Sequence, residues 1–295
     1  MKKKIKFQLY GQRADIGGYA INRLLPNSRI RNVGPFVFLD HLLPVKHSPD
    51  EPLKIVDGTG AHPHRGIATL TYILNGEADH FDSAGNHAKV GSGGVQWMKA
   101  GNGIIHDEAV NVDSKANDFL THALQFWVNL PANNKAEPPQ YIPLQADEVP
   151  KRSLNDSKGW IKVINGEYES LVSRIPNYTK QFIYHVHLEA GKAFLLPTEI
   201  RFEYAALTPL HNATINDVNF KKGALIVFSQ DDGIIDITNT SNEAIDIILF
   251  GGAISAERII YGGPFVMNSD SEIAGAFKDF YAGKYGKIEY TAGAR

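Results

Sequence analysis

The histidines of this chain are concentrated in its first half, and two short segments there have spacings that suit metal binding. Eight of the eleven histidines precede Pro131. Segment 62–64 (His-Pro-His) places two imidazoles two residues apart, and its central proline favours extended backbone, so both rings point to one side of a strand. Segment 106–108 (His-Asp-Glu) repeats this spacing with an imidazole and a carboxylate.

If these two segments lie on neighbouring strands, their side chains form one donor set. That set comprises His62, His64, His106 and Glu108. Three imidazoles and a carboxylate suit Fe, Ni, Mn, Co or Zn. The chain has no cysteine, which excludes disulfides, thiolate metal sites and thiol catalysis. Ordinary surface or core histidines are the alternative, but two same-face pairs in one half favour a single metal site.

The remaining histidines are interpreted more plainly. His80 and His87 fall in a polar hairpin, where we expect both to be solvated. His41 ends an apolar run and fits either a place near the site or the core. Segment 185–187 has the same spacing as the first pair, but the rest of the second half offers only His211 as a further imidazole. We therefore expect no second metal site.

Short strands are predicted along most of the chain, because runs of β-branched and aromatic residues are bounded by Gly, Asn, Asp and Pro. Asn75-Gly76 predicts a hairpin between two of them, and residues 83–86 predict another turn. Many short strands favour a sandwich or barrel. The strands are predicted over residues 67–74, 77–82, 123–129, 193–196, 223–228, 233–238 and 244–250.

One helix is predicted near the C-terminus. Residues 269–272 (SDSE) fit a capping box, apolar residues then recur with helical spacing, and Gly283 is a suitable end. Residues 133–159 are polar and rich in proline, which is typical of a linker. The sequence thus predicts an all-β fold with an N-terminal metal-binding domain over 1–132, a linker over 133–159, and a second β-barrel domain with the terminal helix over 160–295.

The bulk composition excludes several classes of protein. The chain has 295 residues, of which 43% are hydrophobic, and its net charge is -2. This balance gives no reason to expect nucleic acid or an acidic membrane as a partner. Polar residues interrupt the N-terminal segment, and no stretch approaches the roughly 20 apolar residues that span a bilayer. We expect a cytoplasmic protein.

Longer segments of the chain resemble the pirin family, a branch of the cupin superfamily. The resemblance covers nearly the whole chain and is most specific in the first half. The C-terminal GPFVMN at 263–268, with the helix after it, is similar to the family's ending. The first-half segments are 34–41 (GPFVFLDH), 62–74 (HPHRGIATLTYIL), 94–108 (GVQWMKAGNGIIHDE) and 124–131 (LQFWVNLP).

The resemblance implies a bicupin fold, with two jelly-roll (cupin) barrels and one metal, usually Fe(II), in the first barrel only. The family's three His and one Glu match His62, His64, His106 and Glu108 position by position. Where the family usually has a glutamate after its His-x-His-Arg-Gly-aromatic motif, this chain has Ala68.

Two functions follow from the resemblance. One is flavonol (quercetin) 2,3-dioxygenation, in which Glu108 is both metal ligand and catalytic base. The other is metal-dependent, redox-sensing regulation through a protein partner. Four aromatic side chains either line a substrate pocket or belong to the core: Phe36, Phe38, Trp97 and Phe126.

Overall fold

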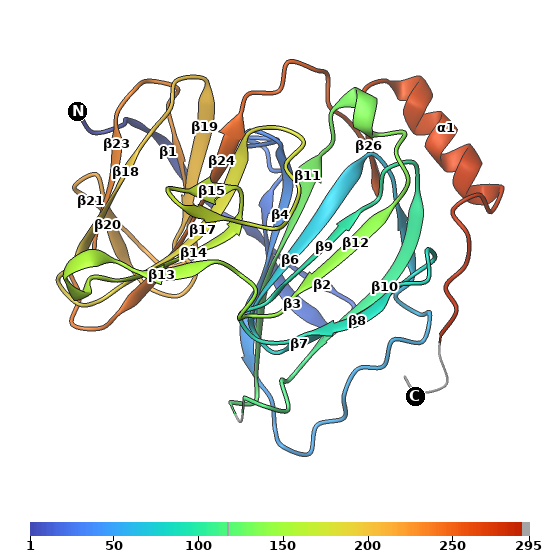
Figure 1. The fold of residues 1–295 in the computed structure, drawn as a ribbon, viewed down its shortest axis with the longest axis horizontal. Helices are drawn as coiled ribbons and strands as arrows, with labels where there is room; N and C mark the ends of the chain where they lie inside the picture. The colour runs from blue at the N-terminus through green and yellow to red at the C-terminus, as the bar shows by residue number, and fades with distance from the viewer. Residues whose placement is uncertain (117, 291–295) are drawn as a thin grey trace. The chain divides into compact units, whose positions relative to one another are not determined.

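The computed structural model describes residues 1–116 and 118–290, and its contacts divide the chain into two compact units. One unit contains Met1–Arg13, Arg23–Val37 and Val149–Ser255, and we call it the C-terminal barrel. The other contains Ala14–Asn22, Phe38–Glu148 and the described chain from Ala256 onward, and we call it the N-terminal barrel. Apart from one short C-terminal helix the fold is built from strands, as the sequence predicts (Figure 1).

The N-terminal barrel consists of two antiparallel sheets. A buried cluster that includes Ile73, Ala78 and Val110 joins residues of both, so the core lies between the sheets. The seven-stranded sheet runs β12 (Gln140–Leu144), β9 (Val95–Lys99), β6 (Ile67–Asn75), β11 (Leu120–Asn129), β4 (Phe36–Lys46), β3 (Tyr19–Leu25), β2 (Gln12–Ile16). The four-stranded sheet runs β5 (His62–His64), β10 (Ile104–Asn111), β7 (Glu77–Asp82), β8 (His87–Val90).

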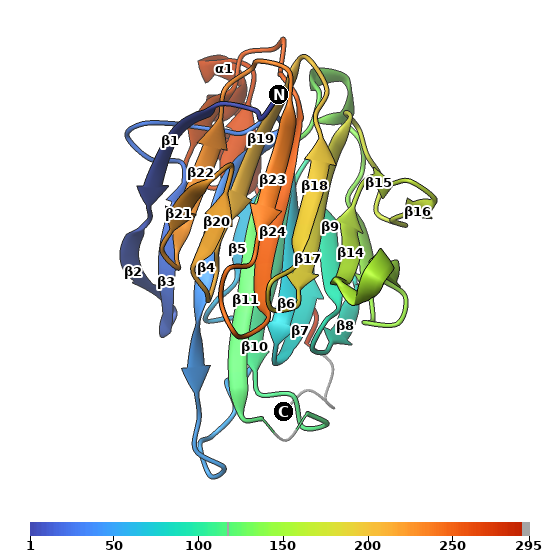
Figure 2. The same ribbon diagram turned by 90° about the vertical axis from the view of Figure 1, so that its left-hand side faces the viewer.

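The C-terminal barrel repeats this plan with its own core of buried aliphatic and aromatic side chains. Figure 2 views it from the side of its smaller sheet. The larger sheet runs β1 (Ile5–Tyr10), β22 (Ala224–Phe228), β19 (Phe202–Leu207), β24 (Ile245–Ala253), β17 (Gln181–Leu188), β14 (Gly159–Asn165), β13 (Lys151–Ser153). The smaller sheet runs β18 (Ala193–Pro197), β23 (Ile234–Thr238), β20 (Ala213–Ile215), β21 (Val218–Phe220), and β15 (Glu167–Tyr168) pairs with β16 (Leu171–Val172).

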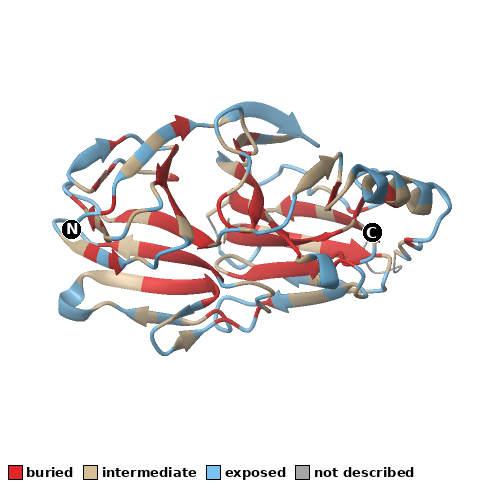
Figure 3. Ribbon diagram, turned by 90° about the horizontal axis from the view of Figure 1, so that it is seen from above, coloured by how far each residue is buried: buried red, intermediate tan, exposed pale blue. Residues whose placement is uncertain are grey.

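The chain has short helical and hairpin elements outside these sheets. The hairpin of β25 (Ile260–Gly262) and β26 (Phe265–Met267) precedes helix α1 (Asp270–Tyr281). Ser269 caps α1 by accepting a hydrogen bond from the Glu272 backbone N–H, which confirms the predicted capping box. Figure 3 shows that buried residues concentrate in the strands, whereas α1 is largely exposed or intermediate. The short 3₁₀ turns are η1 (Ala132–Asn134) and η2 (Asn155–Ser157).

The hairpin predicted at Asn75-Gly76 is wrong. Asn75-Gly76 connects β6 to β7, but these strands lie in different sheets and do not pair. Strand β6 pairs instead with β9 and β11, which satisfy its backbone hydrogen-bonding groups on both edges. The turn at residues 83–86 does join a true hairpin, with Phe81 opposite His87.

Residues 133–159, which the sequence suggests as a linker, contain two strands. Strand β12 pairs with β9 in the N-terminal barrel, and β13 pairs with β14 in the C-terminal barrel. The domain boundaries at residues 132 and 160 remain predictions from the sequence. Among the described residues, no helix is long and apolar enough to cross a membrane.

Lys135 is a buried cation at the centre of a hydrogen-bond cluster in the N-terminal barrel. Its ammonium donates to the Gly66 carbonyl at 2.9 Å, to Oδ1 of Asn129 at 2.7 Å and to the Val266 carbonyl at 2.7 Å. Burial lowers the pKa of Lys135 to about 8. One side chain therefore ties the loop after β5 to the end of β11 and to β26.

Replacing Lys135 by Met should destabilise the N-terminal barrel. The change leaves two backbone carbonyls and one amide oxygen buried without their donor, at a cost of roughly 3 kcal/mol or more. Urea unfolding followed by circular dichroism measures this difference. Lys287→Met, at an exposed position of the same unit, is the control and should change stability little. Equal unfolding midpoints for the two variants would contradict the role of Lys135.

Candidate metal centre

The centre is organised by strand β10, which lies between β5 and β7. On one side the register places His106 opposite His62. On the other side it places Glu108 opposite His80. His106 and Glu108 are two residues apart on one strand and therefore share a face, and directly opposite residues of an antiparallel pair lie on the same face. Pairing alone thus gathers these four side chains.

The three predicted imidazoles converge. Ring centroids lie 4.4 Å apart for His62 and His106, 4.9 Å for His62 and His64, and 5.0 Å for His64 and His106. One ligand nitrogen from each ring lies within 4.8 Å of the others. His64 and His106 are buried, whereas His62 lies at the solvent side.

Backbone carbonyls fix the tautomers of two of these rings. Nδ1 of His62 lies 2.8 Å from the Gly60 carbonyl, and Nδ1 of His64 lies 3.0 Å from the Pro264 carbonyl. A carbonyl can only accept, so each Nδ1 carries the proton and each Nε2 keeps its lone pair. Nε2 of His62 lies 3.0 Å from Nε2 of His106. The lone pair of His62 Nε2 is therefore directed toward the His106 ring, and a ligand nitrogen of His64 lies within 4.8 Å of both.

Burial keeps the rings of His64 and His106 neutral. Desolvation, with a smaller contribution from His62, lowers the pKa of His64 to about 3. Desolvation also holds the pKa of His106 well below its ordinary value, assisted by the neighbouring histidines. Metals bind neutral imidazole, so these rings need not lose a proton at neutral pH.

Glu108 lies beside His106, and two amide side chains hold its carboxylate. Its Oε2 accepts a hydrogen bond from Nε2 of Gln96 at 2.6 Å, and its Oε1 accepts one from Nε2 of Gln125. The Glu108 carboxylate has a ligand atom within 4.8 Å of His106 and His80, but it does not fall in the close group with His62 and His64. The structure therefore brings three predicted ligands together and sets the fourth beside His106.

The expectation that His80 is solvated is wrong. Its side chain is 1% exposed, because β7 pairs with β10 and turns this residue into the barrel. The ring stacks on Tyr141 with centroids 4.1 Å apart and an interplanar angle of 5°. Nε2 of His80 lies 3.3 Å from Oδ2 of Asp82. His87, the other histidine of this hairpin, is exposed as predicted.

Two glycines let the ligand loop approach its neighbours closely. At Gly60 a Cβ would lie 2.6 Å from Oδ1 of Asp107, the buried carboxylate that accepts from the Gly58 backbone N–H. Gly66 has φ +79°, and a Cβ there would lie 2.1 Å from the Val266 carbonyl. A larger residue at either position would displace the loop that carries His62 and His64.

Comparison with known proteins now decides the family. The Pirin model matches residues 18–128, and the model of the Pirin C-terminal cupin domain matches residues 183–286. A Pseudomonas aeruginosa protein, provisionally named a quercetin 2,3-dioxygenase, is 30% identical over 287 residues, 97% of this chain and 99% of its own. The chain belongs to the pirin family. The resemblance of its motifs to that family is confirmed.

Solved structures agree with this assignment. A quercetin 2,3-dioxygenase from Acinetobacter baumannii matches with a TM-score of 0.87 and 27% identity, covering 98% of this chain and 100% of its own. The bacterial pirin YhhW from Escherichia coli, in complex with nickel(II), matches with a TM-score of 0.64 and 18% identity, covering 84% and 99%. The second likeness shows the fold alone. The bicupin fold of the pirin family is thereby established for this chain.

Two aromatic side chains lie near this centre, Phe38, which is a candidate from the sequence, and Trp127, which is not. Trp127 packs edge-on against His64, with centroids 4.8 Å apart, and Phe38 stacks on Trp127 at 4.2 Å. Nε1 of Trp127 is buried without a hydrogen-bond partner among the described residues. Phe36 instead packs against Phe250 in the C-terminal barrel. Phe126 and Trp97 are fully buried core residues.

Sequence reasoning missed several residues of the site. Trp127 and Gln125 lie two apart on β11 within the matched motif 124–131, and that alternation could have shown that they share a face. His80 and Asp82 have the same His-x-acid spacing as segment 106–108. That spacing was the available signal for His80.

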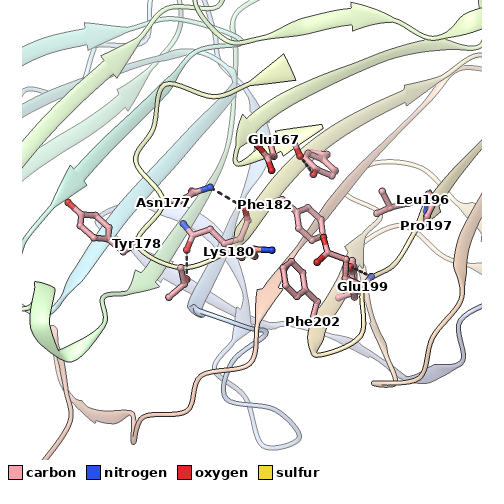
Figure 4. Close-up of a pocket in the computed structure, with 13 residues that line it drawn as sticks. Glu167, Asn177, Tyr178, Lys180, Phe182, Leu196, Pro197, Glu199 and Phe202 are labelled. Carbon is pink, nitrogen blue, oxygen red and sulfur yellow. Dashed lines mark hydrogen bonds between the residues drawn. The ribbon is translucent and has the colours of Figure 1, made fainter. Parts of the chain in front are cut away.

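The C-terminal barrel has no comparable histidine cluster among the described residues. His185 and His187 both contact Oδ1 of Asp246, at 2.9 and 2.8 Å, and form a pair of hydrogen bonds in place of a third ligand. A pocket of about 450 Å³ lies elsewhere in this barrel, and no histidine lines it (Figure 4). Its lining includes Phe182, Tyr204 and Glu199.

His41, which the sequence allowed either near the site or in the core, is a buried residue of β4. Its Nε2 lies 2.7 Å from Nε2 of His122. Desolvation by burial lowers the pKa of His41 to about 4. Between its ordinary pKa of about 6.5 and this value, the unfolded chain binds a proton at His41 and the folded chain does not. The free energy of unfolding therefore falls as the pH falls through this window.

His41→Asn should reduce this pH dependence. Asparagine stays neutral, so the variant should lose about 2 kcal/mol less stability than the parent between pH 7 and pH 5. Urea unfolding of metal-free protein at the two pH values measures the difference. Histidines that do not contact His41 contribute equally to both proteins and cancel. Identical pH dependence in parent and variant would show that His41 is not a source of acid lability.

Proposed function

We propose that this chain binds one divalent transition metal, Fe(II) in the first instance, and acts as a flavonol (quercetin) 2,3-dioxygenase. The ligands in this proposal are His62, His64, His106 and Glu108. The observation that carries it is the convergence of three imidazoles, two with carbonyl-fixed tautomers, on one position. The similarity to a quercetin 2,3-dioxygenase of the same fold supports the substrate class.

The donor set fits the metal. Imidazole suits Zn, Cu, Fe and Ni, and a carboxylate oxygen extends the range to Mn. Fe(II), Ni, Mn, Co and Zn therefore remain candidates. Bringing Glu108 to an ion held by His62 and His64 requires a small movement of its carboxylate, which Gln96 and Gln125 hold from the other side. When bound, the metal supplies the redox chemistry through which dioxygen opens the flavonol ring with release of carbon monoxide.

The chain's own residues prepare the flavonol. Glu108 accepts the proton of the 3-hydroxyl group, since a carboxylate can act as base while it stays near a metal. Two amide donors, Gln96 and Gln125, orient it for this task. The Trp127 indole supplies an aromatic face beside His64 and an N–H donor with no protein partner among the described residues. A planar, oxygen-rich substrate suits these groups.

Metal content tests the ligand assignment. His106→Ala should abolish stoichiometric Fe(II), because His106 is central to the ligand cluster. His185→Ala, in the C-terminal barrel, should leave the metal content unchanged. Elemental mass spectrometry of the purified variants measures both. A metal-replete His106 variant, or a metal-free His185 variant, would place the site elsewhere.

Glu108→Gln tests the base. Glutamine keeps the size and one oxygen ligand but cannot accept the proton, and a general base contributes typically about 10²- to 10⁴-fold in rate. We expect turnover of quercetin per bound metal to fall by that factor. The loss of flavonol absorbance under air, with rates normalised to metal content, is the measurement. An equally fast variant would show that the proton goes to another acceptor.

The same assay separates the two functions that the resemblance implies. Quercetin consumption by the metal-loaded parent supports the dioxygenase. If the parent binds metal and leaves quercetin intact with Fe(II), Ni, Mn, Co and Zn in turn, the redox-sensing regulatory role with a protein partner becomes the better account.

A further inference from the structure

A fourth imidazole lies beside the three that the family motif supplies. His80 is buried, and its ring centroid lies 5.5 Å from that of His106. Ligand atoms of His80, His106 and Glu108 all lie within 4.8 Å of one another. Two ligands of one transition-metal ion lie at most about 4.3 Å apart, because each bond is about 2.0–2.2 Å long. Three ligands of the same ion lie closer, about 3.0–3.6 Å apart, so side-chain adjustments of about an ångström let these groups hold an ion.

We propose that His80 is a metal-binding residue, which with His106 and Glu108 forms an inner position for a divalent ion. The inner position and the outer one, formed by His62, His64 and His106, share His106. This inference rests on the metal centre proposed above. It explains why Glu108 is placed beside His80 and His106 rather than with the other two histidines.

The chemistry of the inner set is distinct from that of the outer set. His80, His106 and Glu108 supply two imidazoles and one carboxylate, the combination that non-haem Fe(II) oxygenases use while leaving other positions open for ligands. The outer set supplies three imidazoles. Glu108 already lies beside His80 and His106 while Gln96 and Gln125 hold its carboxylate, so an ion in the inner position has this carboxylate close by.

A connected group of side chains holds the inner set in place. Tyr141 stacks on His80 and donates through its hydroxyl to Oε1 of Gln96 at 3.1 Å. Gln96 in turn donates to Glu108. The same two residues, Tyr141 and Gln96, thus position both the imidazole and the carboxylate.

A carboxylate also orients the His80 ring. Nε2 of His80 faces Oδ2 of Asp82, which places the proton on that nitrogen and leaves the lone pair on Nδ1. The other oxygen of Asp82 accepts from the backbone N–H groups of Ala84 and Asn86. A histidine that binds a metal commonly has such a carboxylate on its second nitrogen.

Cobalt(II) binding to the full-length protein tests the proposal. The double variant His62→Ala/His64→Ala removes the outer position and keeps the inner one. We expect it to bind stoichiometric Co(II) with affinity weakened by about 10-fold or more, as measured by equilibrium dialysis. Adding His80→Phe to this double variant should abolish binding at the same Co(II) concentration. Phenylalanine keeps a ring that can stack on Tyr141 but has no ligand nitrogen.

Controls separate a ligand from a structural residue. His80→Gln is a second removal variant that keeps a hydrogen-bonding group toward Asp82, and circular dichroism shows which variants are folded. His87→Phe changes an exposed histidine of the same hairpin, and it should leave Co(II) binding of the double variant as it was. In the otherwise unchanged protein, His80→Phe should alter the visible absorption of bound Co(II), and His87→Phe should not.

Two results would overturn the inference in distinguishable ways. If the double variant binds Co(II) equally with and without His80, while His106→Ala abolishes binding to the parent, the metal centre stands and His80 is not a ligand. If the parent itself binds no Co(II), the proposed metal centre fails, and the inner position fails with it.

Discussion

The antiparallel register of β10 between β5 and β7 is the constraint on which the whole centre depends. It places His106 opposite His62 on one edge and Glu108 opposite His80 on the other. Because side chains alternate along a strand, a slip of one residue would turn these groups to the opposite face. The Asp107 carboxylate, which accepts from the Gly58 N–H, helps to lock β10 against the preceding loop. Position in the sheet, more than any single contact, makes the chemistry available.

Burial and hydrogen bonds then determine the charge and the tautomer of the histidines that the register brings together. Burial removes the positive charge from His64 and His106 by lowering their pKa values. Backbone carbonyls at Gly60 and Pro264 decide which nitrogen of the outer rings keeps its lone pair. Neither effect alone would give a usable donor set, since a protonated ring or the wrong tautomer offers a cation no electrons. The side-chain amides of Gln96 and Gln125 orient the Glu108 carboxylate by donating to its two oxygens.

The sequence predicts those features that depend on local spacing. The histidine pair at 62–64 and the capping box at 269–272 could both be recognised, because strand alternation and helix capping depend on residues only a few positions apart. The hairpin predicted at Asn75-Gly76 was wrong because a turn sequence does not determine which strands pair. The solvated position predicted for His80 was wrong because this polar hairpin becomes buried only through its pairing with β10. The place of Glu108 likewise depends on Gln96 and Gln125, which are distant from it along the chain.

The carbonyl of Pro264 limits where this chain can be truncated. It belongs to the β25–β26 segment near the end of the chain, yet it lies in the N-terminal barrel and accepts from His64. The first family match ends at residue 128, so a gene fragment drawn to that boundary would encode the three histidines without the carbonyl that sets the tautomer of His64. The C-terminal segment and the barrel that carries these histidines belong to one compact unit.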